Sequence, residues 1–191
     1  MLHLLKNYPS KKFDWDNIFL AIAYLMAKGS HCSARKTAAI VVGTDGGIIT
    51  SGINGTPKGS LNCDEIFPPK AQMTDEQKAA HKEFQAYNEI HAEKNAINKA
   101  ANSSRDISGA TMYCTCKPCN ECIKDILQTK IVRIVYFEKQ KKPNGGVTSK
   151  NFEESYHPLI EDAIKQKSIE IVQKDIDWAA FGLQMSSVNI K

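Results

Sequence analysis

The sequence has little of what marks membrane proteins and nucleic-acid-binding proteins. No apolar segment approaches the length that crosses a bilayer, and the apolar run over residues 1–6 is too short for a secretory signal. Aromatic residues make up only 8%, and no stretch interleaves them with basic residues, which argues against a single-stranded nucleic-acid track. Basic residues are dispersed except at residues 139–142, and the net charge is only +4. These features predict a cytoplasmic protein with a small anionic ligand and no membrane partner.

Internal repeats and low-complexity segments are absent as well, so the length of the chain sets the expected number of domains. A chain of 191 residues fits one domain with a substantial core, and 42% hydrophobic residues is typical of globular proteins. We therefore predict a single domain over residues 1–191. The polar residues 60–87 interrupt the apolar pattern, and we interpret them as an insertion into that domain.

Apolar periodicity and turn-forming residues predict helices that alternate with strands. One helix begins at Asp14, a second is capped by Asn88, and a third is opened by Pro118. The pattern gives both the start and the end of three helices, which cover residues 14–28, 89–101 and 152–167. The expected strands cover residues 37–43, 47–53, 110–115, 131–137 and 168–173. This alternation predicts an α/β protein with a layered sheet.

Six cysteines are the most unusual component of this chain. Four of them crowd into residues 114–122, and such crowding in a reducing compartment indicates metal binding more often than disulfides. Cys119 and Cys122 follow a proline and lie three residues apart, so a helix would bring their sulfurs to one face. The segment His91-Ala92-Glu93 adds an imidazole and a carboxylate. We therefore predict that His91, Cys119 and Cys122 bind one zinc ion.

One histidine and two cysteines leave a fourth coordination position for water, whereas a structural zinc has four protein ligands. The combination His-x-Glu and Pro-Cys-x-x-Cys is the signature of zinc deaminases, in which the glutamate is not a ligand and moves protons. Glu93 would accept a proton from water and pass it to the ring nitrogen and the departing amine. The predicted reaction is hydrolytic deamination of a nitrogenous ring, with Glu93 as the catalytic residue.

A second assignment of the cysteines is a closed site of four thiolates. It would use the cysteines of the crowded segment alone: Cys114, Cys116, Cys119 and Cys122. Cys114 and Cys116 fall at alternate positions of a predicted strand and its exit, where a small buried side chain is the simpler interpretation. We favour that interpretation and the mixed histidine–cysteine site.

Five segments occur in an order and spacing that resemble a known family, the deoxycytidylate (dCMP) deaminases of the zinc-dependent cytidine deaminase superfamily, especially the phage type. The resemblance covers about residues 14–137 and includes a Gly-x-Asn-Gly-x-Pro loop that points to dCMP. The segments are residues 33–41, 52–57, 88–97, 109–115 and 118–122. The resemblance implies a three-layer cytidine deaminase-like fold, with a mixed five-stranded sheet between helices. It also implies zinc-dependent conversion of dCMP to dUMP and ammonia, which supplies thymidylate synthesis.

The same resemblance implies further properties of the site and its control. In the family, the asparagine of the loop contacts the substrate sugar, and this role carries over to Asn54, which also fits a simple turn residue. Arg35 and Lys36 are candidates for the monophosphate, although surface charge explains them equally well. The family implies a hexamer activated by dCTP with Mg²⁺ and inhibited by dTTP. Residues 37–39 depart from the family's Val-Gly-Ala, and Ile53 replaces an aromatic residue, so this control could differ.

A second zinc is suggested by Cys32, Cys63 and His81, which lie outside the catalytic signature. In phage-type relatives, residues at matching positions join a further histidine to hold a structural zinc, but here Gln77 occupies that position. His31, a water or Asp64 would have to complete the shell. The alternative is two buried thiols and a surface histidine.

Two other functions remain open at the level of sequence. A base-editing deaminase that acts on tRNA or DNA would use the same zinc chemistry on a polynucleotide, but it would need a basic groove with aromatic residues. A non-catalytic zinc module for interactions would need neither Glu93 nor an open coordination position. Nucleic acid is therefore not an expected partner.

Overall fold

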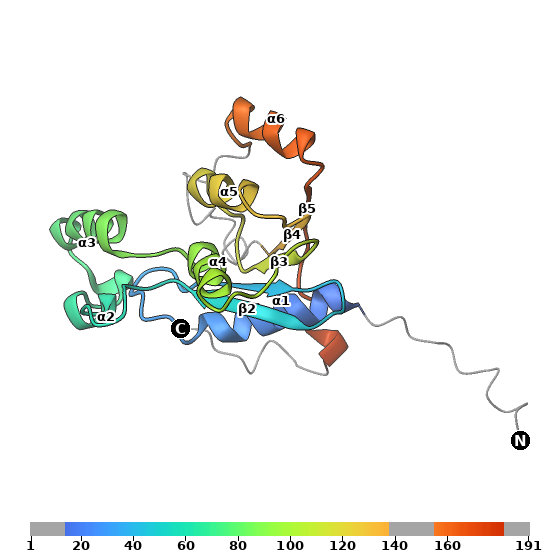
Figure 1. Cartoon of the computed structure of the whole chain (residues 1–191). Helices are drawn as coiled ribbons and strands as arrows, with labels where there is room; N and C mark the ends of the chain where they lie inside the picture. The colour runs from blue at the N-terminus through green and yellow to red at the C-terminus, as the bar shows by residue number, and fades with distance from the viewer. Residues whose placement is uncertain (1–13, 138–154, 182–191) are drawn as a thin grey trace, which may run out of the picture.

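The computed structural model describes residues 14–137 and 155–181, which form one five-stranded sheet flanked by helices (Figure 1). The strands lie in the order β2-β1-β3-β4-β5. β1 is antiparallel to β2 and β3, whereas β3, β4 and β5 are parallel. Their bounds are β1 Ala38–Val42, β2 Ile48–Ile53, β3 Thr111–Cys114, β4 Arg133–Tyr136 and β5 Glu170–Gln173. The features predicted at residues 1–6 and 139–142 lie outside the described residues.

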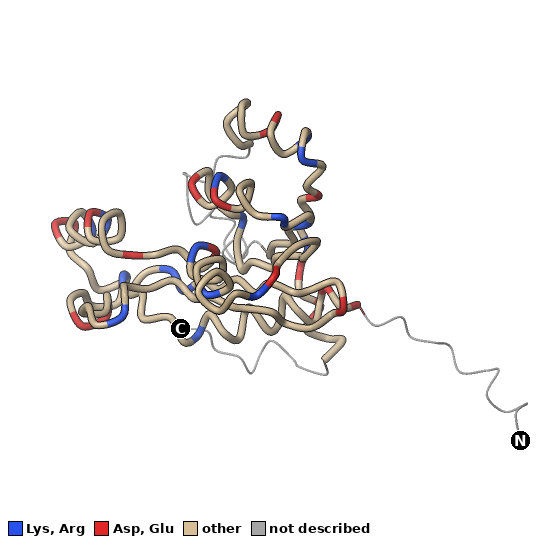
Figure 2. Tube along the Cα trace, in the orientation of Figure 1, with Lys and Arg blue, Asp and Glu red and all other residues tan. Residues whose placement is uncertain are grey.

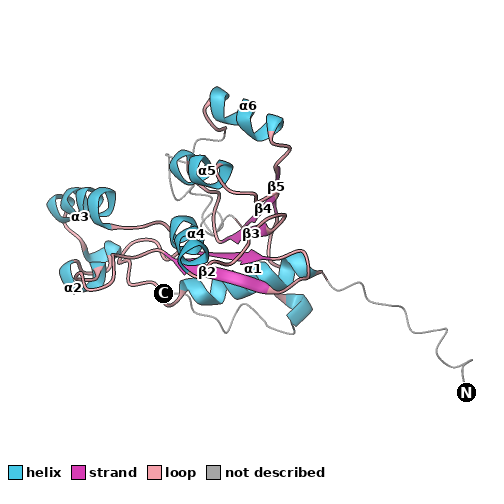
Figure 3. Cartoon of the chain, in the orientation of Figure 1, coloured by secondary structure: helices cyan, strands magenta, loops and turns pink. Residues whose placement is uncertain are grey.

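Helices cover both faces of the sheet, which gives three layers (Figure 3). α1 (Trp15–Ala27) packs on one face, and α4 (Ala92–Asn102), α5 (Asn120–Leu127) and α6 (Pro158–Gln166) pack on the other. The mixed sheet between helices confirms the predicted fold class. No helix among the described residues is both long and apolar enough to cross a membrane.

Alternating side chains of the strands supply the two cores. In β1, Ile40 points to the α1 layer, and Ala39 and Val41 point to the layer of α4 and α5. This alternation follows from the two-residue period of a strand, and all three side chains are fully buried. The central strands are therefore apolar on both faces, as the continuous run Ala38–Val42 requires.

Polar contacts fix α1 to the sheet. The Asp14 carboxylate accepts the backbone N–H of Asn17 and caps the helix, as predicted. Asp16 accepts two hydrogen bonds from the Arg133 guanidinium of β4, at 2.7 and 2.8 Å, and one from the Tyr113 hydroxyl at 2.8 Å. The hydrogen bond from Arg133 is the main reason that the pKa of Asp16 lies below its ordinary value.

The first turn of α4 lies directly against β2 because β2 carries a glycine there. A Cβ at Gly52 would overlap the carbonyl oxygen of Ala92 and come within 2.6 Å of the backbone nitrogen of Ala96. Two side chains support this close approach: Asn95 Nδ2 donates to the carbonyl of Ile53 at 2.8 Å, and Thr50 Oγ1 donates to the carbonyl of Ala96 at 3.1 Å. The start of α4 is thus fixed on the sheet.

Three predicted helix starts differ from the structure. Asn88, predicted to cap the helix over 89–101, is the last residue of α3 (Asp75–Asn88), and His91 is the N-cap of α4. Pro118 precedes α5 instead of opening it, since Cys119 is the N-cap. α6 begins at Pro158 and not at 152, with residues 152–154 outside the described part. Spacing predicted each helix but not the residue at which it begins.

Residues 60–87 contain short helices that extend to one side of the sheet (Figure 1). The short ones are α2 (Cys63–Ile66) and the 3-10 turn η2 (Lys70–Gln72), and the long α3 follows them. Elsewhere in the described part, a 3-10 turn, η3, covers Ala179–Phe181. Thr74 and Gln77 form a capping box at the start of α3, in which the Gln77 side chain accepts the backbone N–H of Thr74 at 3.0 Å. Gln77 is therefore engaged in starting the helix.

Candidate active site and a second cysteine–histidine cluster

The candidate active site lies at one edge of the sheet, where several segments end or begin. β2 ends at Ile53, which pairs with Ala38 at the start of β1, and β3 ends at Cys114, which pairs with Ala39. An isolated bridge between Gly55 and Ile90 ties the loop after β2 to the residue before His91. The N-termini of α4 and α5 therefore meet at this edge.

His91, Cys119 and Cys122 come together there, and we call them the catalytic cluster. His91 Nδ1 lies 3.2 Å from Cys122 Sγ and 3.5 Å from Cys119 Sγ, and the three ligand atoms all lie within 4.8 Å of one another. Zinc with tetrahedral sulfur and nitrogen ligands separates them by about 3.5 Å, so this donor set fits the ion. In the described part of the chain, no fourth ligand atom joins this group.

Glu93 stands beside this cluster on the first turn of α4. The side chain is only 5% exposed, and burial is the main cause that raises its pKa. The carboxyl group also interacts with its own backbone N–H, with the charge of His91 and with the Cys122 thiol. His91 and Glu93 would diverge in mid-helix, but they converge here because His91 is the N-cap and Glu93 belongs to the first turn.

Hydrogen bonding shifts the pKa values of the two thiols of the catalytic cluster in opposite directions. The hydrogen bond from Cys122, with further help from His91, lowers the pKa of Cys119 to about 3. The hydrogen bond with Cys119, together with burial, raises the pKa of Cys122, so the pair behaves as one thiolate and one thiol. The hydrogen bond with Cys119 raises the pKa of His91. A bound cation would take the place of the protons in these hydrogen bonds.

The other two cysteines of the crowded segment do not join a ligand group among the described residues. Cys114 is 1% exposed and packs in the core with Met112 and Tyr136. Burial raises its pKa well above the ordinary value, as expected of an inert thiol. The geometry thus favours the histidine–cysteine site over the site of four thiolates.

The predicted substrate-binding residues lie at the same edge of the sheet. Asn54 directly follows β2 and is 5% exposed. Arg35 and Lys36 precede β1, and their side chains are exposed. Asn54 Nδ2 donates to the carbonyl of Arg35 at 2.9 Å, so the loop and this cationic segment are held together.

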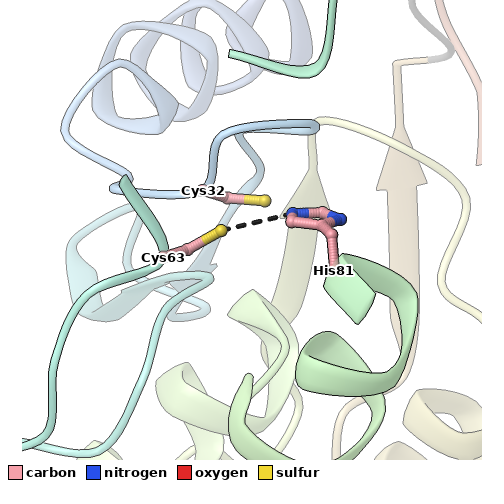
Figure 4. Close-up of side chains that lie close together, drawn as sticks. All are labelled: Cys32, Cys63 and His81. Atoms are coloured by element: carbon pink, nitrogen blue, oxygen red, sulfur yellow. Dashed lines mark hydrogen bonds between the residues drawn. The ribbon is translucent and has the colours of Figure 1, made fainter. Parts of the chain in front are cut away.

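Cys32, Cys63 and His81 form a second group, which we call the buried cluster (Figure 4). Cys32 lies in the loop after α1, Cys63 begins α2, and His81 lies on α3. Their exposed fractions are 2%, 2% and 4%, and Cys63 Sγ lies 3.2 Å from His81 Nε2. Burial lowers the pKa of His81, so its ring is neutral and can act as a ligand.

N–H groups surround the sulfurs of the buried cluster. The backbone N–H of Ser33 donates to Cys63 Sγ, and the backbone N–H of Arg35 and Gln85 Nε2 both donate to Cys32 Sγ, each at 3.4 Å. N–H groups that donate to a ligating sulfur stabilise the metal-bound thiolate. The donor set and its surroundings therefore fit zinc as well.

The two side chains predicted to complete this shell lie elsewhere. His31 Nδ1 pairs with Asp64 Oδ2 at 2.9 Å, and both side chains are largely exposed. Glu89 is the carboxylate near the cluster, and its charge raises the pKa of both Cys32 and His81. Burial is the main cause that raises the pKa of Cys32 to about 12, and Glu89 adds to this rise. Sequence analysis missed Glu89, although His81, Gln85 and Glu89 follow a four-residue helical spacing.

Tyr156 is a second residue that the sequence did not single out. Its side chain is 9% exposed, and among the described residues its hydroxyl has no hydrogen-bond partner. Burial is the main cause that raises its pKa, and the charges of Tyr136, Cys114, Glu93 and Cys119 add to this rise in that order. The ring packs under the Lys117 ammonium, 4.3 Å from the ring centroid. No spacing rule connects Tyr156 to the signature 34 residues before it.

Comparisons with known proteins agree with this fold. Residues 13–138 match the model of the cytidine and deoxycytidylate deaminase zinc-binding region. Deoxycytidylate deaminase of Enterobacteria phage T2 is 37% identical over 154 residues, covering 66% of this chain and 81% of the relative. The human deoxycytidylate deaminase is 35% identical over 138 residues, covering 71% of each chain. A crystal structure of dCMP deaminase from cyanophage S-TIM5 with dCMP and dUMP has a TM-score of 0.57 and 28% identity, covering 82% of this chain and 94% of that one.

The sheet and the cluster at its edge define a zinc-binding deaminase fold. The chain belongs to the cytidine and deoxycytidylate deaminase family, as the match over residues 13–138 shows. Within this family, it is most usefully compared with the phage-type dCMP deaminases, so the resemblance noted from the sequence is confirmed.

Proposed function

We propose that this protein is a hydrolase that converts dCMP to dUMP and ammonia, with zinc bound by His91, Cys119 and Cys122. The observation that carries the proposal is the buried carboxyl group of Glu93 beside a three-ligand cluster with no fourth protein ligand among the described residues. The relatives named deoxycytidylate deaminase, and the cyanophage structure with dCMP and dUMP, support this substrate. Such a reaction supplies dUMP for thymidylate synthesis.

The proposed mechanism depends on where the chain can hold a proton. Zinc in such a site supplies an activated water, because coordination lowers the pKa of water from about 16 towards about 7. Glu93 would carry one proton of the attacking water to the ring nitrogen. As the bond between the ring carbon and the amine breaks, it would carry the second proton, from the hydroxyl on that carbon, to the amine, which leaves a carbonyl and ammonia. The raised pKa of Glu93 suits both steps, since a group that is too acidic would not return the proton.

Around this centre, we propose four contacts with the nucleotide. Asn54 stands next to the sugar, and Arg35 and Lys36 provide positive charge for the monophosphate. Tyr156 donates its buried hydroxyl to the substrate, because a buried polar group without a partner is costly unless a ligand satisfies it. The first three of these side chains lie at the same edge of the sheet.

For the buried cluster, we propose a structural zinc with four protein ligands. Cys32, Cys63 and His81 provide three of them. Glu89, whose carboxylate shares the Gln85 amide with Cys32, would turn towards the ion to provide the fourth in place of the absent histidine. The ion would join the loop after α1 to α2 and α3. This arrangement attaches residues 60–87, which we propose as an insertion, to the single domain over residues 1–191.

We propose small-molecule partners rather than a polynucleotide. Figure 2 shows acidic and basic residues interspersed along the described trace. A cytoplasmic location fits thiols that must remain reduced, and all six cysteines are free. By resemblance to the family, we also propose a hexamer, activation by dCTP with Mg²⁺ and inhibition by dTTP.

The test is ammonia release from a panel of substrates at equal concentration. We expect rapid release from dCMP, slower release from deoxycytidine and none from tRNA or single-stranded DNA. Deamination of tRNA or DNA in preference to dCMP would favour the polynucleotide editor. A protein that contains zinc and deaminates none of these would be an interaction module.

A further inference from the structure

Asn54 lies between the catalytic cluster and the buried cluster, and its side chain makes four hydrogen bonds. Three of them are short, and the long one to Glu89, at 3.5 Å, is the one that a sugar oxygen would replace. A side-chain amide can donate two hydrogen bonds and accept two. Oδ1 accepts from Ser30 Oγ at 2.7 Å and from the backbone N–H of Thr37 at 2.8 Å. Nδ2 donates to the carbonyl of Arg35 at 2.9 Å and to a Glu89 carboxylate oxygen at 3.5 Å. Neighbouring chain segments therefore determine where this amide points.

Two of these partners connect Asn54 to the buried cluster. Ser30, which is 1% exposed, also accepts the backbone N–H of Cys32 on its hydroxyl at 3.2 Å. Gln85 Nε2 donates to Cys32 Sγ at 3.4 Å and to Glu89 Oε2 at 2.8 Å. A displacement of Cys32 or Glu89 would thus move a hydrogen-bond partner of Asn54.

The backbone connects Asn54 to the catalytic cluster. Gly55, the next residue, donates to the carbonyl of Ile90 at 3.2 Å, and Ile90 donates to the carbonyl of Gly55 at 2.9 Å. Ile90 directly precedes His91, the N-cap of α4. The position of Asn54 is therefore tied both to the metal ligand His91 and, through the carbonyl of Arg35, to the cationic segment.

We propose that Asn54 is a positioning residue that couples metal occupancy of the buried cluster to nucleotide binding at the catalytic cluster. The inference rests on the second metal site proposed above. A metal ion on Cys32 and Glu89 fixes the hydrogen-bond partners of Asn54, and outer partners commonly orient a ligating carboxylate in this way. Without the metal, Glu89 and the loop with Cys32 can move, so Asn54 and the residues that contact the sugar and phosphate are no longer held in place.

Coupling of this kind is reciprocal, which provides a quantitative check. If emptying the buried cluster weakens nucleotide binding by about tenfold, within the usual range of 5- to 150-fold, then the bound nucleotide must strengthen metal binding by the same factor. dUMP is the suitable probe because the reaction product binds without being turned over. Its affinity can be measured by calorimetry, independently of catalytic rate.

The test is a double-mutant cycle that combines dUMP affinity with metal content per chain. Cys63→Ser empties the buried cluster, and Ser30→Ala removes the hydroxyl between Cys32 and Asn54. We expect Cys63→Ser to weaken dUMP binding by about tenfold in the parent protein and much less in the Ser30→Ala background. Asn17→Ala is the matched control: Asn17 is also buried, at 3% exposed, and its amide binds the backbone of Asp177 at 2.7 and 3.1 Å. The tenfold effect should persist in that control.

Each other outcome has a distinct meaning. Equal losses from Cys63→Ser in both backgrounds, or no loss at all despite a lower metal content, overturn the coupling. Unchanged metal content in Cys63→Ser removes the second metal site and this inference with it, but leaves the proposed deaminase intact. Absence of dUMP binding by the parent protein would instead count against the proposed function.

A variant that does not fold leaves the reciprocal measurement available. The unmodified protein is titrated with a zinc chelator, with and without saturating dUMP, and both zinc ions are followed. We expect dUMP to raise the chelator concentration needed to empty the buried cluster by about tenfold. Identical titrations of that cluster overturn the coupling.

Discussion

The catalytic cluster and the buried cluster offer the same three donors, one imidazole nitrogen and two sulfurs, in different surroundings. In the catalytic cluster, His91 is exposed, Cys119 is half-buried, and the imidazole presents Nδ1. In the buried cluster, all three side chains are buried, and His81 presents Nε2. The first adjoins a buried carboxyl group at two helix N-termini, and the second is enclosed by N–H donors to sulfur.

This contrast shows that ligand type does not decide what such a cluster does. Access decides it, because a reaction needs one coordination position that water and substrate can reach. An enclosed ion can only hold segments together, as the buried cluster would do for the loop after α1, α2 and α3. The following predictions test this division of roles, from the largest expected effect to the smallest.

Glu93→Gln should separate proton transfer from metal binding. The amide keeps the size of the side chain but cannot exchange a proton, so we expect turnover of dCMP to fall by about 10²- to 10⁴-fold with full zinc content. Steady-state kinetics and metal analysis measure the two quantities. Glu121→Gln is the control. Glu121 forms an exposed ion pair with Lys124 on α5 at 2.7 Å, so this variant should keep the activity of the parent enzyme. Turnover of Glu93→Gln within a few-fold of the parent would remove Glu93 from the mechanism.

A chelator should empty the two clusters in a fixed order. The catalytic ion is reached through a partly exposed site, whereas release from the buried cluster requires local opening and should be roughly tenfold slower or more. Activity should therefore disappear with the first zinc, and the near-ultraviolet circular dichroism should change with the second. Metal release and both signals can be followed in one time course. Loss of the buried metal before activity declines would contradict the assigned roles.

Arg35→Ala tests an exposed cation that follows Cys32 of the buried cluster and precedes β1. A charge-assisted contact with the monophosphate predicts a loss of about tenfold or more in kcat/KM for dCMP, with little change for deoxycytidine. The exposed Lys130, changed to alanine, is the control cation and should affect neither substrate. Equal losses for both substrates would mean that the Arg35 side chain is structural and does not contact the phosphate.

Tyr156→Phe should have the smallest effect on activity. It should weaken substrate binding without lowering the stability of the protein. Removal of a buried hydroxyl without a described partner should leave the free energy of unfolding unchanged or raise it, while KM for dCMP rises several-fold. Tyr113→Phe removes a hydroxyl that donates to Asp16 at 2.8 Å, so it should lower the free energy of unfolding by about 1–3 kcal/mol without affecting KM. Loss of stability in Tyr156→Phe with unchanged KM would make Tyr156 structural.

The catalytic cluster was accessible to sequence analysis because its geometry is local. Cys119 and Cys122 share the start of one helix, so their spacing predicts that pair. His91 and Glu93, only two residues apart, were linked by the deaminase signature and not by helical spacing. The α/β architecture was predictable for the same reason, since apolar periodicity marks each strand. Helix starts were less accessible, because the N-caps of α4 and α5 are the prospective metal ligands themselves and not the usual capping residues.

Residues that act through tertiary contacts were not accessible in this way. Glu89 approaches Cys32 only because α3 folds back against the loop after α1, a contact between residues far apart in the chain. Tyr156 joins the core with Cys114 and Tyr136 only once the segment before α6 has folded against the sheet. The buried cluster was suggested by the family resemblance, while its fourth ligand depended on the fold.

The close contact between β2 and α4 also limits how substrate preference can be redesigned. Position 52 has no room for a side chain against the first turn of α4, whereas position 55 has no heavy atom within 4 Å of the place where a Cβ would stand. Random mutagenesis of this loop would therefore lose most clones that change Gly52 and retain many that change Gly55. A library for other pyrimidine nucleotides should fix the first position and sample the second.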